Sequence, residues 1–323
     1  MGVFVFLPLI LPLTAWPVAR LAEQHLHPRA ATRLLSAVAA VLAVCSTLCL
    51  ALLMVVGTAQ LPGNPLPDGW SDPEVREALP YDEVAGTAAI PALFAVLLSC
   101  GRATWRHGRV RRRAAQALAG GGVPASAGGG VAVLPDRTPY AYALPGSRRA
   151  RRAGRIVVTA GMLAGLDSAE RSALLAHERA HLTGRHHRFL LAVQLAARAN
   201  PFLRPLRTAV SYTAERWADE EAAAAVGSRR AVARAIGKAA LISHAAPVPV
   251  SASALAGFAV AGPVPRRVAA LLAPAPAAGS WPPVRTAVGL AAWGAAAGAA
   301  VSALSSANSA VTLFLVLRAA TPL

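Results

Sequence analysis

The stretch His177-Glu178-Arg179-Ala180-His181 places two histidines four residues apart, around a central glutamate. In a helix of about 3.6 residues per turn, the two imidazoles would project from one face, roughly 40° apart. Asp167 and Glu170, just upstream, have the spacing of a helix N-cap and its N3 acid. We therefore predict that the stretch lies on a helix and that both histidines can bind one metal ion. The alternative is an amphipathic helix that exposes two histidines.

The metal needs a third protein ligand, because a catalytic zinc ion usually takes three and keeps a fourth position open. Glu215 is the best candidate, since four of the 15 acidic residues of the chain lie between Glu215 and Glu221. Asp219 follows Glu215 at i+4, on the same helical face, where it can orient a ligand histidine. A solvated acidic helix face is the alternative. With the paired histidines present, we predict one Zn²⁺ per chain bound by His177, His181 and Glu215.

The composition places part of the chain in a lipid bilayer. Its 323 residues are 55% hydrophobic and only 15% charged, with a mean hydropathy of +0.47, whereas about 25% of the residues of a soluble domain are charged. Four apolar stretches approach or exceed the ~20 residues that a membrane helix needs: 3–19, 34–57, 84–100 and about 286–317. A signal peptide is the alternative for the first, but no basic residue precedes it and no cleavage pattern follows it.

The distribution of charge predicts the orientation of the chain. Residues 102–283 contain 26 Lys and Arg against 8 Asp and Glu, a net charge of +18. The rest of the chain contributes 6 − 7 = −1, so this segment accounts for the whole net charge of +17. The loop 58–83 is acidic, whereas the loop 20–33 is basic. By the positive-inside rule, the segment 102–283 faces the cytoplasm of a multi-pass cell-membrane protein.

Other uses of the basic residues and cysteines are less well supported. The arginine runs at 102–113 and 148–155 contain no pattern of interleaved aromatic residues, so we expect no nucleic-acid partner. The first run follows an apolar span, where anionic headgroups explain it better. Cys45, Cys49 and Cys100 fall within apolar spans and are interpreted as structural thiols.

A small sheet is expected before the metal-binding helix. Residues 131–134, 140–144 and 156–159 have the composition of short strands and follow a Gly/Ala-rich connector at 120–130. An extended peptide can pair with an exposed sheet edge, so these strands are the expected place for contacts with a substrate backbone. Packing of a core is the alternative role for the same strands.

The chain resembles the membrane-integrated gluzincin peptidases. The resemblance covers roughly residues 90–245 and rests on the segments 142–146 (YALPG), 155–163 (RIVVTAGML) and 174–176 (LLA), which runs into the HExxH motif. These peptidases include the beta-lactam sensor-transducer (antirepressor) proteases and, more distantly, the CAAX prenyl and heat-shock membrane proteases. The layout of spans is that of the antirepressor type.

The resemblance implies a fold and a domain organisation. It implies an α-helical membrane protein with about four transmembrane helices and a cytoplasmic α+β gluzincin-type zinc metalloprotease domain. The expected domains are a membrane domain with three transmembrane helices at 1–101, the basic protease domain at 102–283 and a C-terminal transmembrane helix at 284–323.

The same resemblance implies a zinc-dependent metalloendopeptidase. His177, His181 and Glu215 are the implied zinc ligands, Asp219 is their companion, and Glu178 is the implied general base for a zinc-activated water. The expected partners are a protein or peptide substrate and the lipid bilayer, and a homodimer is left open. A cytoplasmic repressor, a membrane protein under quality control and the chain itself all remain open as substrates.

Some features depart from the family pattern or leave alternatives open. Relatives often have an Arg-Asp pair after the second histidine, where this chain has Arg185-His186-His187. Contact of His186 or His187 with the site is one alternative, but both are interpreted as bystanders at the exposed end of the helix. Tyr212, His244 and Arg266 are candidates for a second oxyanion donor, but no spacing selects one. The alternative functions are a catalytically silent membrane sensor or scaffold, and a transporter, which the uncharged spans disfavour.

Overall fold

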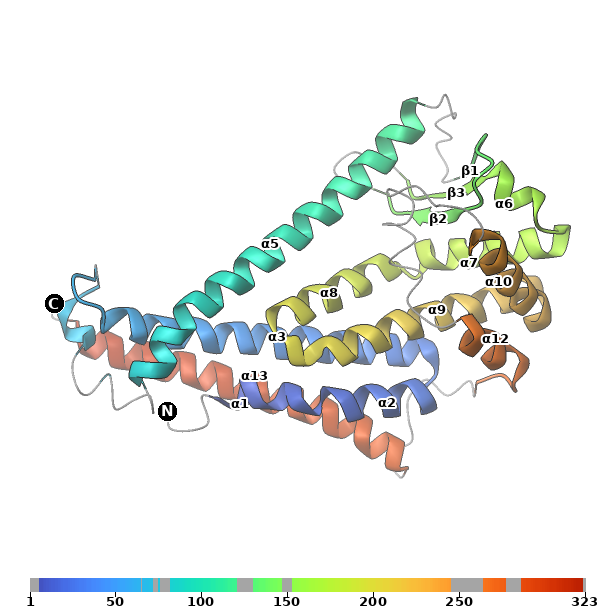
Figure 1. Cartoon of the computed structure of the whole chain (residues 1–323). Helices are drawn as coiled ribbons and strands as arrows, with labels where there is room; N and C mark the ends of the chain where they lie inside the picture. The colour runs from blue at the N-terminus through green and yellow to red at the C-terminus, as the bar shows by residue number, and fades with distance from the viewer. Residues whose placement is uncertain are drawn as a thin grey trace.

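The computed structural model describes residues 6–64, 66–71, 75, 82–120, 130–146, 153–244, 264–276 and 286–321. Most of these residues are helical, and one small sheet is present (Figure 1). The connector at 121–129, the arginines at 148–152 and most of the acidic loop at 72–81 lie outside the described residues.

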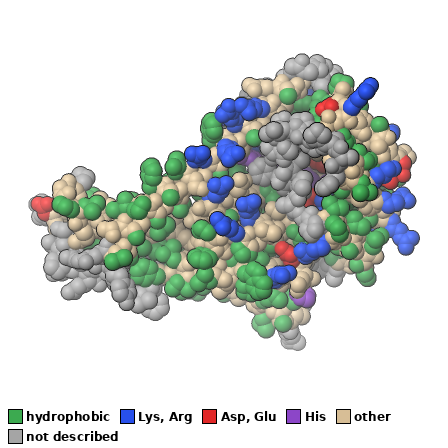
Figure 2. All heavy atoms as spheres, viewed as in Figure 1, with side chains coloured by type: hydrophobic (Ala, Val, Ile, Leu, Met, Phe, Trp, Pro, Cys, Tyr) green, Lys and Arg blue, Asp and Glu red, His purple; other side chains and the backbone are tan. Residues whose placement is uncertain are grey.

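Three described helices are long and apolar enough to cross a membrane. They are α3 (Pro28–Ala59), the Val84–Leu118 part of α5 (Asp82–Gly120), and α13 (Ala287–Ala319). In the most apolar window of the α5 segment, only 17% of the residues are buried, so its apolar side chains face outward, as lipid contact requires. Figure 2 shows hydrophobic but no basic side chains over the end of the molecule where α5 starts, and basic and hydrophobic side chains together over the remainder.

The first predicted span differs from the other three, so the count of four spans is not confirmed. From Leu7 the chain forms three short consecutive pieces, which are α1 (Leu7–Ile10), η2 (Leu11–Thr14) and α2 (Ala15–His25). The prolines at 8, 12 and 17 explain the interruption, because proline lacks the N–H that a continuous helix needs. Residues 3–5 lie outside the described part of the chain.

Helices α3 and α5 cross where two glycines meet. A Cβ atom added to Gly57 would lie 2.2 Å from the carbonyl carbon of Gly86, far inside van der Waals contact. The absence of both side chains therefore allows the two backbones to touch, as small residues do at helix crossings in membranes. The last residues of α13 lie at the same end, where Trp70 of η3 (Asp68–Ser71) donates a hydrogen bond to Thr321 Oγ1 at 3.0 Å.

Helix α5 carries the chain from the other candidate membrane helices to the sheet, as Figure 1 shows. It is one continuous helix of 39 residues, so the predicted domain boundary at residue 101 falls inside it. At about 1.5 Å per residue, the helix is about 58 Å long, nearly twice the hydrocarbon thickness of a bilayer. The position of the boundary remains a prediction.

The expected sheet is present, with strand limits within one residue of the predicted ones. Its strands are β1 (Val131–Leu134), β2 (Ala141–Leu144) and β3 (Arg155–Thr159), in the order β1-β3-β2. The central strand pairs parallel to β1 and antiparallel to β2, which leaves β2 at an edge. The buried face of the sheet packs with the end of α5 through Ala114 and Leu118.

The remaining helices surround the candidate metal site. They are α6 (Ala160–Ala164), α7 (Ser168–Thr183), α8 (His186–Ala199), η4 (Pro201–Leu203), α9 (Arg204–Val226), α10 (Arg229–His244) and α12 (Val264–Leu272). Helices α8 and α9 form a hairpin that packs along α3. Asn200, at the turn of the hairpin, donates a hydrogen bond to Ser46 of α3 at 3.0 Å, and so links this hairpin to α3.

Candidate metal centre

Helix α7 positions the two histidines of the HExxH motif. The predicted capping box is confirmed: Asp167 accepts from the Glu170 N–H at 2.8 Å, and Glu170 accepts from the Asp167 N–H at 2.9 Å. These bonds satisfy two N–H groups at the helix start and fix where the helix begins. His177 and His181 then lie one turn apart, both buried, with their Nε2 atoms 3.1 Å apart.

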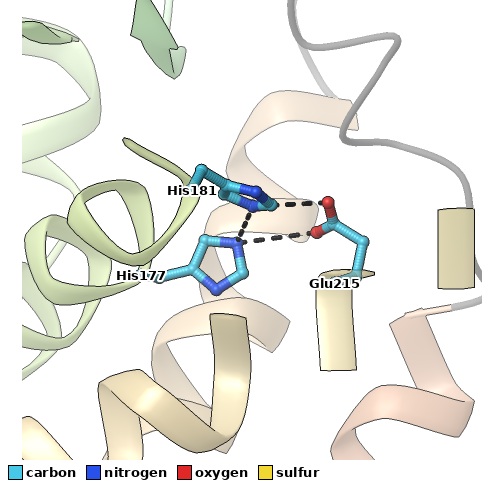
Figure 3. A group of neighbouring side chains, drawn as sticks. All are labelled: His177, His181 and Glu215. Atoms are coloured by element: carbon cyan, nitrogen blue, oxygen red, sulfur yellow. Dashed lines mark hydrogen bonds and ion pairs between the residues drawn. The ribbon is translucent and has the colours of Figure 1, made fainter. Parts of the chain in front are cut away.

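Helix α9 brings Glu215 to the same point, as Figure 3 shows. The carboxylate oxygens of Glu215 lie 3.5 Å from His177 Nε2 and 3.4 Å from His181 Nε2. Glu215 is almost completely buried, at 1% exposure, and its Oε1 has no hydrogen-bond partner among the described residues. A buried carboxylate oxygen without a donor is costly, unless a cation faces it.

The triangle formed by these ligand atoms fits a zinc ion. A tetrahedral zinc ion with bonds of about 2.0–2.1 Å holds its ligand atoms about 3.3 Å apart. The two Nε2 atoms, 3.1 Å apart, are close to that value, and each lies at a similar distance from one of the two carboxylate oxygens, His177 at 3.5 Å from Oε2 and His181 at 3.4 Å from Oε1. Two imidazole nitrogens and a carboxylate are also a donor set that catalytic zinc uses. His177, His181 and Glu215 can therefore hold a metal such as zinc.

Each histidine has a polar neighbour beside its other ring nitrogen. His177 Nδ1 lies 3.0 Å from Asp219 Oδ1, and Asp219 is fully buried. If this nitrogen carries the proton, Nε2 is left with its lone pair toward Glu215. The structure thus brings Asp219 to the place where the sequence predicts an orienting carboxylate.

The interpretation of His186 as an exposed bystander is wrong. His186 is completely buried, and its Nδ1 lies 2.8 Å from Nδ1 of His181. Arg185, just before it, has the left-handed φ of 52°, and this turn between α7 and α8 directs His186 back toward α7. His186 thus occupies, for His181, the position that Asp219 occupies for His177.

Arg267 of α12 is a part of the centre that sequence reasoning missed. It donates to Asp219 through Nε at 2.9 Å and Nη2 at 2.6 Å, and its Nη1 lies 2.9 Å from Glu215. All three residues are buried, so the guanidinium compensates carboxylate charge that water cannot reach. The neighbouring Arg266, which the sequence singled out, instead pairs with Glu23 at 3.2 Å.

The electrostatics of the centre favour a cation. Although burial opposes the charged ring, Asp219 and Glu215 raise the pKa of His177 to about 10. Burial lowers the pKa of His181 to about 3, so that this ring is neutral at pH 7. Burial opposes ionisation of Glu215, but Arg267 and the histidines hold the pKa of its carboxyl below its usual value. The centre therefore offers an ionised carboxylate and a neutral imidazole, both of which suit a metal ligand.

Glu178 lines a pocket beside the three candidate metal ligands. This pocket is a small cavity of about 50 Å³, whose wall also includes His181, His187 and residues 142–143 of β2. Burial raises the pKa of the Glu178 carboxyl to about 7, while the N–H of Ala143 hydrogen-bonds to it and opposes the shift. A carboxyl that titrates near neutrality can accept and return a proton.

Strand β2 presents its free edge to this pocket. The Thr159 N–H donates to the carbonyl of Tyr140 at 3.1 Å, which fixes the alternation of the antiparallel ladder. In such a ladder, the polar backbone groups of Ala141 and Ala143 point away from β3. The edge that reaches Glu178 can thus pair with an extended peptide.

The three oxyanion candidates have different surroundings. Tyr212 is buried, and the guanidinium of Arg266 lies 4.2 Å from the centre of its ring. The side chain of His244 lies outside the described residues. The structure therefore selects neither Tyr212 nor Arg266 for this role.

Comparisons with known proteins support a peptidase. Residues 104–199 match the model of peptidase family M48. The match contains His177, Glu178 and His181 but ends before Glu215, and it covers less than a third of the chain. No curated protein and no solved structure matches the chain. The antirepressor type expected from the sequence is not confirmed, and the match to family M48 supports a zinc metallopeptidase.

Proposed function

We propose that this chain is a membrane-integrated zinc metalloendopeptidase that cleaves cytoplasmic or membrane proteins, in signalling or other regulated proteolysis. The observation that carries the proposal is the buried triangle of His177, His181 and Glu215, with Glu178 beside it. The match to peptidase family M48 over the segment with both histidines supports the same assignment.

The proposed mechanism divides the work among the residues of the centre. Zinc, when bound by the three ligands, supplies a Lewis acid that polarises a carbonyl and acidifies water. Glu178 takes a proton from the attacking water and returns it to the nitrogen of the departing amine. Asp219 and His186 hold the ligand rings in orientation, and Arg267 neutralises the excess carboxylate charge.

The proposed substrate lies extended along β2. Pairing with the free edge would align the peptide backbone, so that one carbonyl reaches the centre while the side chains remain free to vary. Ala143 marks where this edge meets the proposed general base, because its N–H reaches Glu178. This mode of binding suits an endopeptidase, since it requires neither end of the substrate.

The centre lies near one end of a candidate membrane helix. Thr32, in the second turn of α3, donates a hydrogen bond to Thr213 at 2.9 Å, and Thr213 precedes Glu215 by two residues. With 26 basic against 8 acidic residues in 102–283, the positive-inside rule puts this end in the cytoplasm. Proteins at or in the cytoplasmic face of the membrane are therefore the substrates we propose.

A peptide library prepared from an unfolded proteome tests the activity without a known substrate. The purified full chain, in neutral detergent, is incubated with the library after zinc loading, after chelation and after zinc restoration. The proposal predicts internal cleavages that disappear on chelation and return with zinc. If a fully zinc-loaded chain produces no cleavage, the membrane sensor or scaffold becomes the better account.

A further inference from the structure

A second cavity, which we call the basic pocket, lies behind the metal-binding helix. It has a volume of about 560 Å³, and four arginines line it: Arg29, Arg33, Arg185 and Arg188. Ala180 and Thr183 of α7 also line it, on the face turned away from Glu178, which lies in the other pocket. The basic pocket is therefore distinct from the proposed catalytic site.

The arginines of the basic pocket have no acidic ion-pair partner among the residues that the structure describes. Within the described part of the chain, none of the four forms an ion pair with a carboxylate. Glu221 is the one acidic residue that lines the pocket, and its Oε1 accepts a hydrogen bond from Trp217 Nε1 at 3.0 Å. All four arginines are exposed, and four positive charges against one negative charge give a local excess of about +3, which attracts anions.

Trp217 provides an aromatic wall for two of the arginines. The guanidinium carbons of Arg29 and Arg33 lie 5.5 and 5.4 Å from the centre of its ring. Such cation–π contacts hold the side chains in place and leave their N–H groups available to a ligand. A pre-oriented pair of guanidinium groups suits a phosphate, which accepts two hydrogen bonds from each.

The turn between α7 and α8 places two of the arginines on one side of the basic pocket. Arg185 occupies this turn with a left-handed backbone, and α8, which carries Arg188, begins at the next residue. The negative end of the α7 dipole and the positive end of the α8 dipole meet at this turn and offset each other, so the positive potential on this side comes from the two arginine side chains.

We propose that the basic pocket binds a phosphate-bearing anion, either the headgroup of an anionic phospholipid or a soluble phosphate ester. Its volume falls in the range of pockets for small molecules, which are about 300–1,000 Å³, and leaves room for a group attached to the phosphate. Arg29 and Arg33 lie in the first two turns of α3, just before the uncharged stretch 34–57. This position at the start of a candidate membrane helix makes a lipid headgroup one of the two sources.

The proposed site also touches the surroundings of the metal centre. The Trp217 ring lies 4.4 Å from the ring of His186, and His186 contacts the ligand His181. Trp217, which lines the basic pocket, and His186 would thus connect a ligand in this pocket to His181. The binding claim does not depend on peptidase activity, and its test measures binding alone.

Titration calorimetry on the full chain, in neutral detergent, tests the proposal with three probes. These are dioctanoyl phosphatidylglycerol, dioctanoyl phosphatidylcholine and glycerol 3-phosphate. We expect saturable binding of phosphatidylglycerol, glycerol 3-phosphate or both, and a weaker response to the zwitterionic lipid. A preference for phosphatidylglycerol over glycerol 3-phosphate identifies the lipid as the source, and equal or tighter binding of glycerol 3-phosphate identifies a soluble ester.

Two double variants separate the pocket from the general basic charge of the chain. Arg33→Gln with Arg188→Gln removes one arginine from each wall, and we expect binding to weaken at least about tenfold. Arg204→Gln with Arg207→Gln removes the same charge from exposed positions outside the pocket and should leave the affinity unchanged. If the first double variant fails to fold, Arg188→Gln alone, on the exposed side of α8, should still weaken binding.

Three results would overturn the proposal. They are the absence of binding of both phosphate probes to the wild-type chain, equal affinity for phosphatidylcholine and phosphatidylglycerol when glycerol 3-phosphate does not bind, and equal weakening by the two double variants. The last result would show adsorption driven by net charge rather than a defined pocket.

Discussion

Arg267 holds Asp219 through two parallel hydrogen bonds, at 2.9 and 2.6 Å, across 48 residues of sequence. The same guanidinium reaches Glu215 at 2.9 Å. One buried cation therefore compensates a proposed metal ligand and the carboxylate that contacts His177. Because a bound metal would supply positive charge at the same place, the importance of Arg267 should depend on whether zinc is present.

Replacement of Arg267 by glutamine tests this dependence. In the zinc-free chain, the variant removes the guanidinium that both carboxylates share and leaves mainly His177 to balance them, and we expect a loss of about 3–5 kcal/mol of stability. Zinc should restore part of that loss. Thermal unfolding with zinc and after chelation measures both states, and Arg266→Gln, which removes the pair with Glu23, is the control. Equal losses with and without zinc would contradict the account.

His186 should tune the affinity for zinc through His181. Without the contact at 2.8 Å, the His181 ring loses its orienting partner, and His186→Ala should weaken zinc binding about 10–100-fold. Competition with a chromogenic chelator measures this affinity. His187→Ala is the matched control, because His187 lines the pocket of Glu178 without contacting a ligand ring. Unchanged affinity in His186→Ala would show that His186 only fills space.

The crossing of α3 and α5 should tolerate no side chain at Gly57. Gly57→Ala would place a methyl group 2.2 Å from Gly86, so the helices must separate, at a cost of about 1–3 kcal/mol. Gly101→Ala, in α5, meets no atom within 4 Å and should be neutral or slightly stabilising. Thermal unfolding in detergent compares the two, and similar midpoints would argue against close contact at this crossing.

The capping box of α7 should make stability depend on pH. Backbone hydrogen bonds lower the pKa of both Asp167 and Glu170, with help from Lys238 for both and from Arg234 for Asp167. A carboxyl whose folded pKa is depressed stabilises the fold above its unfolded pKa of about 4. This stabilisation is lost as the pH falls through the lower, folded pKa.

The double variant Asp167→Asn with Glu170→Gln removes this titration and keeps the shapes of the side chains. The wild-type chain should unfold at a higher temperature than the variant at pH 6, and the difference should shrink toward pH 3. A difference in unfolding midpoint that stays constant over this range would mean that the two carboxyls contribute no charge-dependent stability.

Local signals explain which features the sequence predicts well. Helix spacing and a capping box locate α7, alternating short apolar runs locate the three strands, and the uncharged runs locate α3 and α13. The i+4 spacings in α7 and α9 place each pair of polar residues on one helical face, and packing of the two helices brings the faces together.

Features that depend on tertiary contacts are those that the sequence missed. Nothing in the spacing distinguishes Arg267 from Arg266, because only the packing of α12 against α9 decides which one reaches Asp219. His186 looks like the exposed tail of a helix until the left-handed turn at Arg185 buries it. The helix of α5 continues beyond the apolar span because arginine and alanine favour helix in water as well.

The most direct test compares the N-termini of proteins in cells that carry the wild-type chain or Glu178→Gln. The substitution preserves His177, His181 and Glu215, so zinc should remain bound, while the group that accepts the proton is removed. We predict new N-termini that occur only with the wild-type chain, and these would also identify the substrate. Identical N-termini, with both proteins present at equal levels and loaded with zinc, would contradict the assignment of the chain as a peptidase.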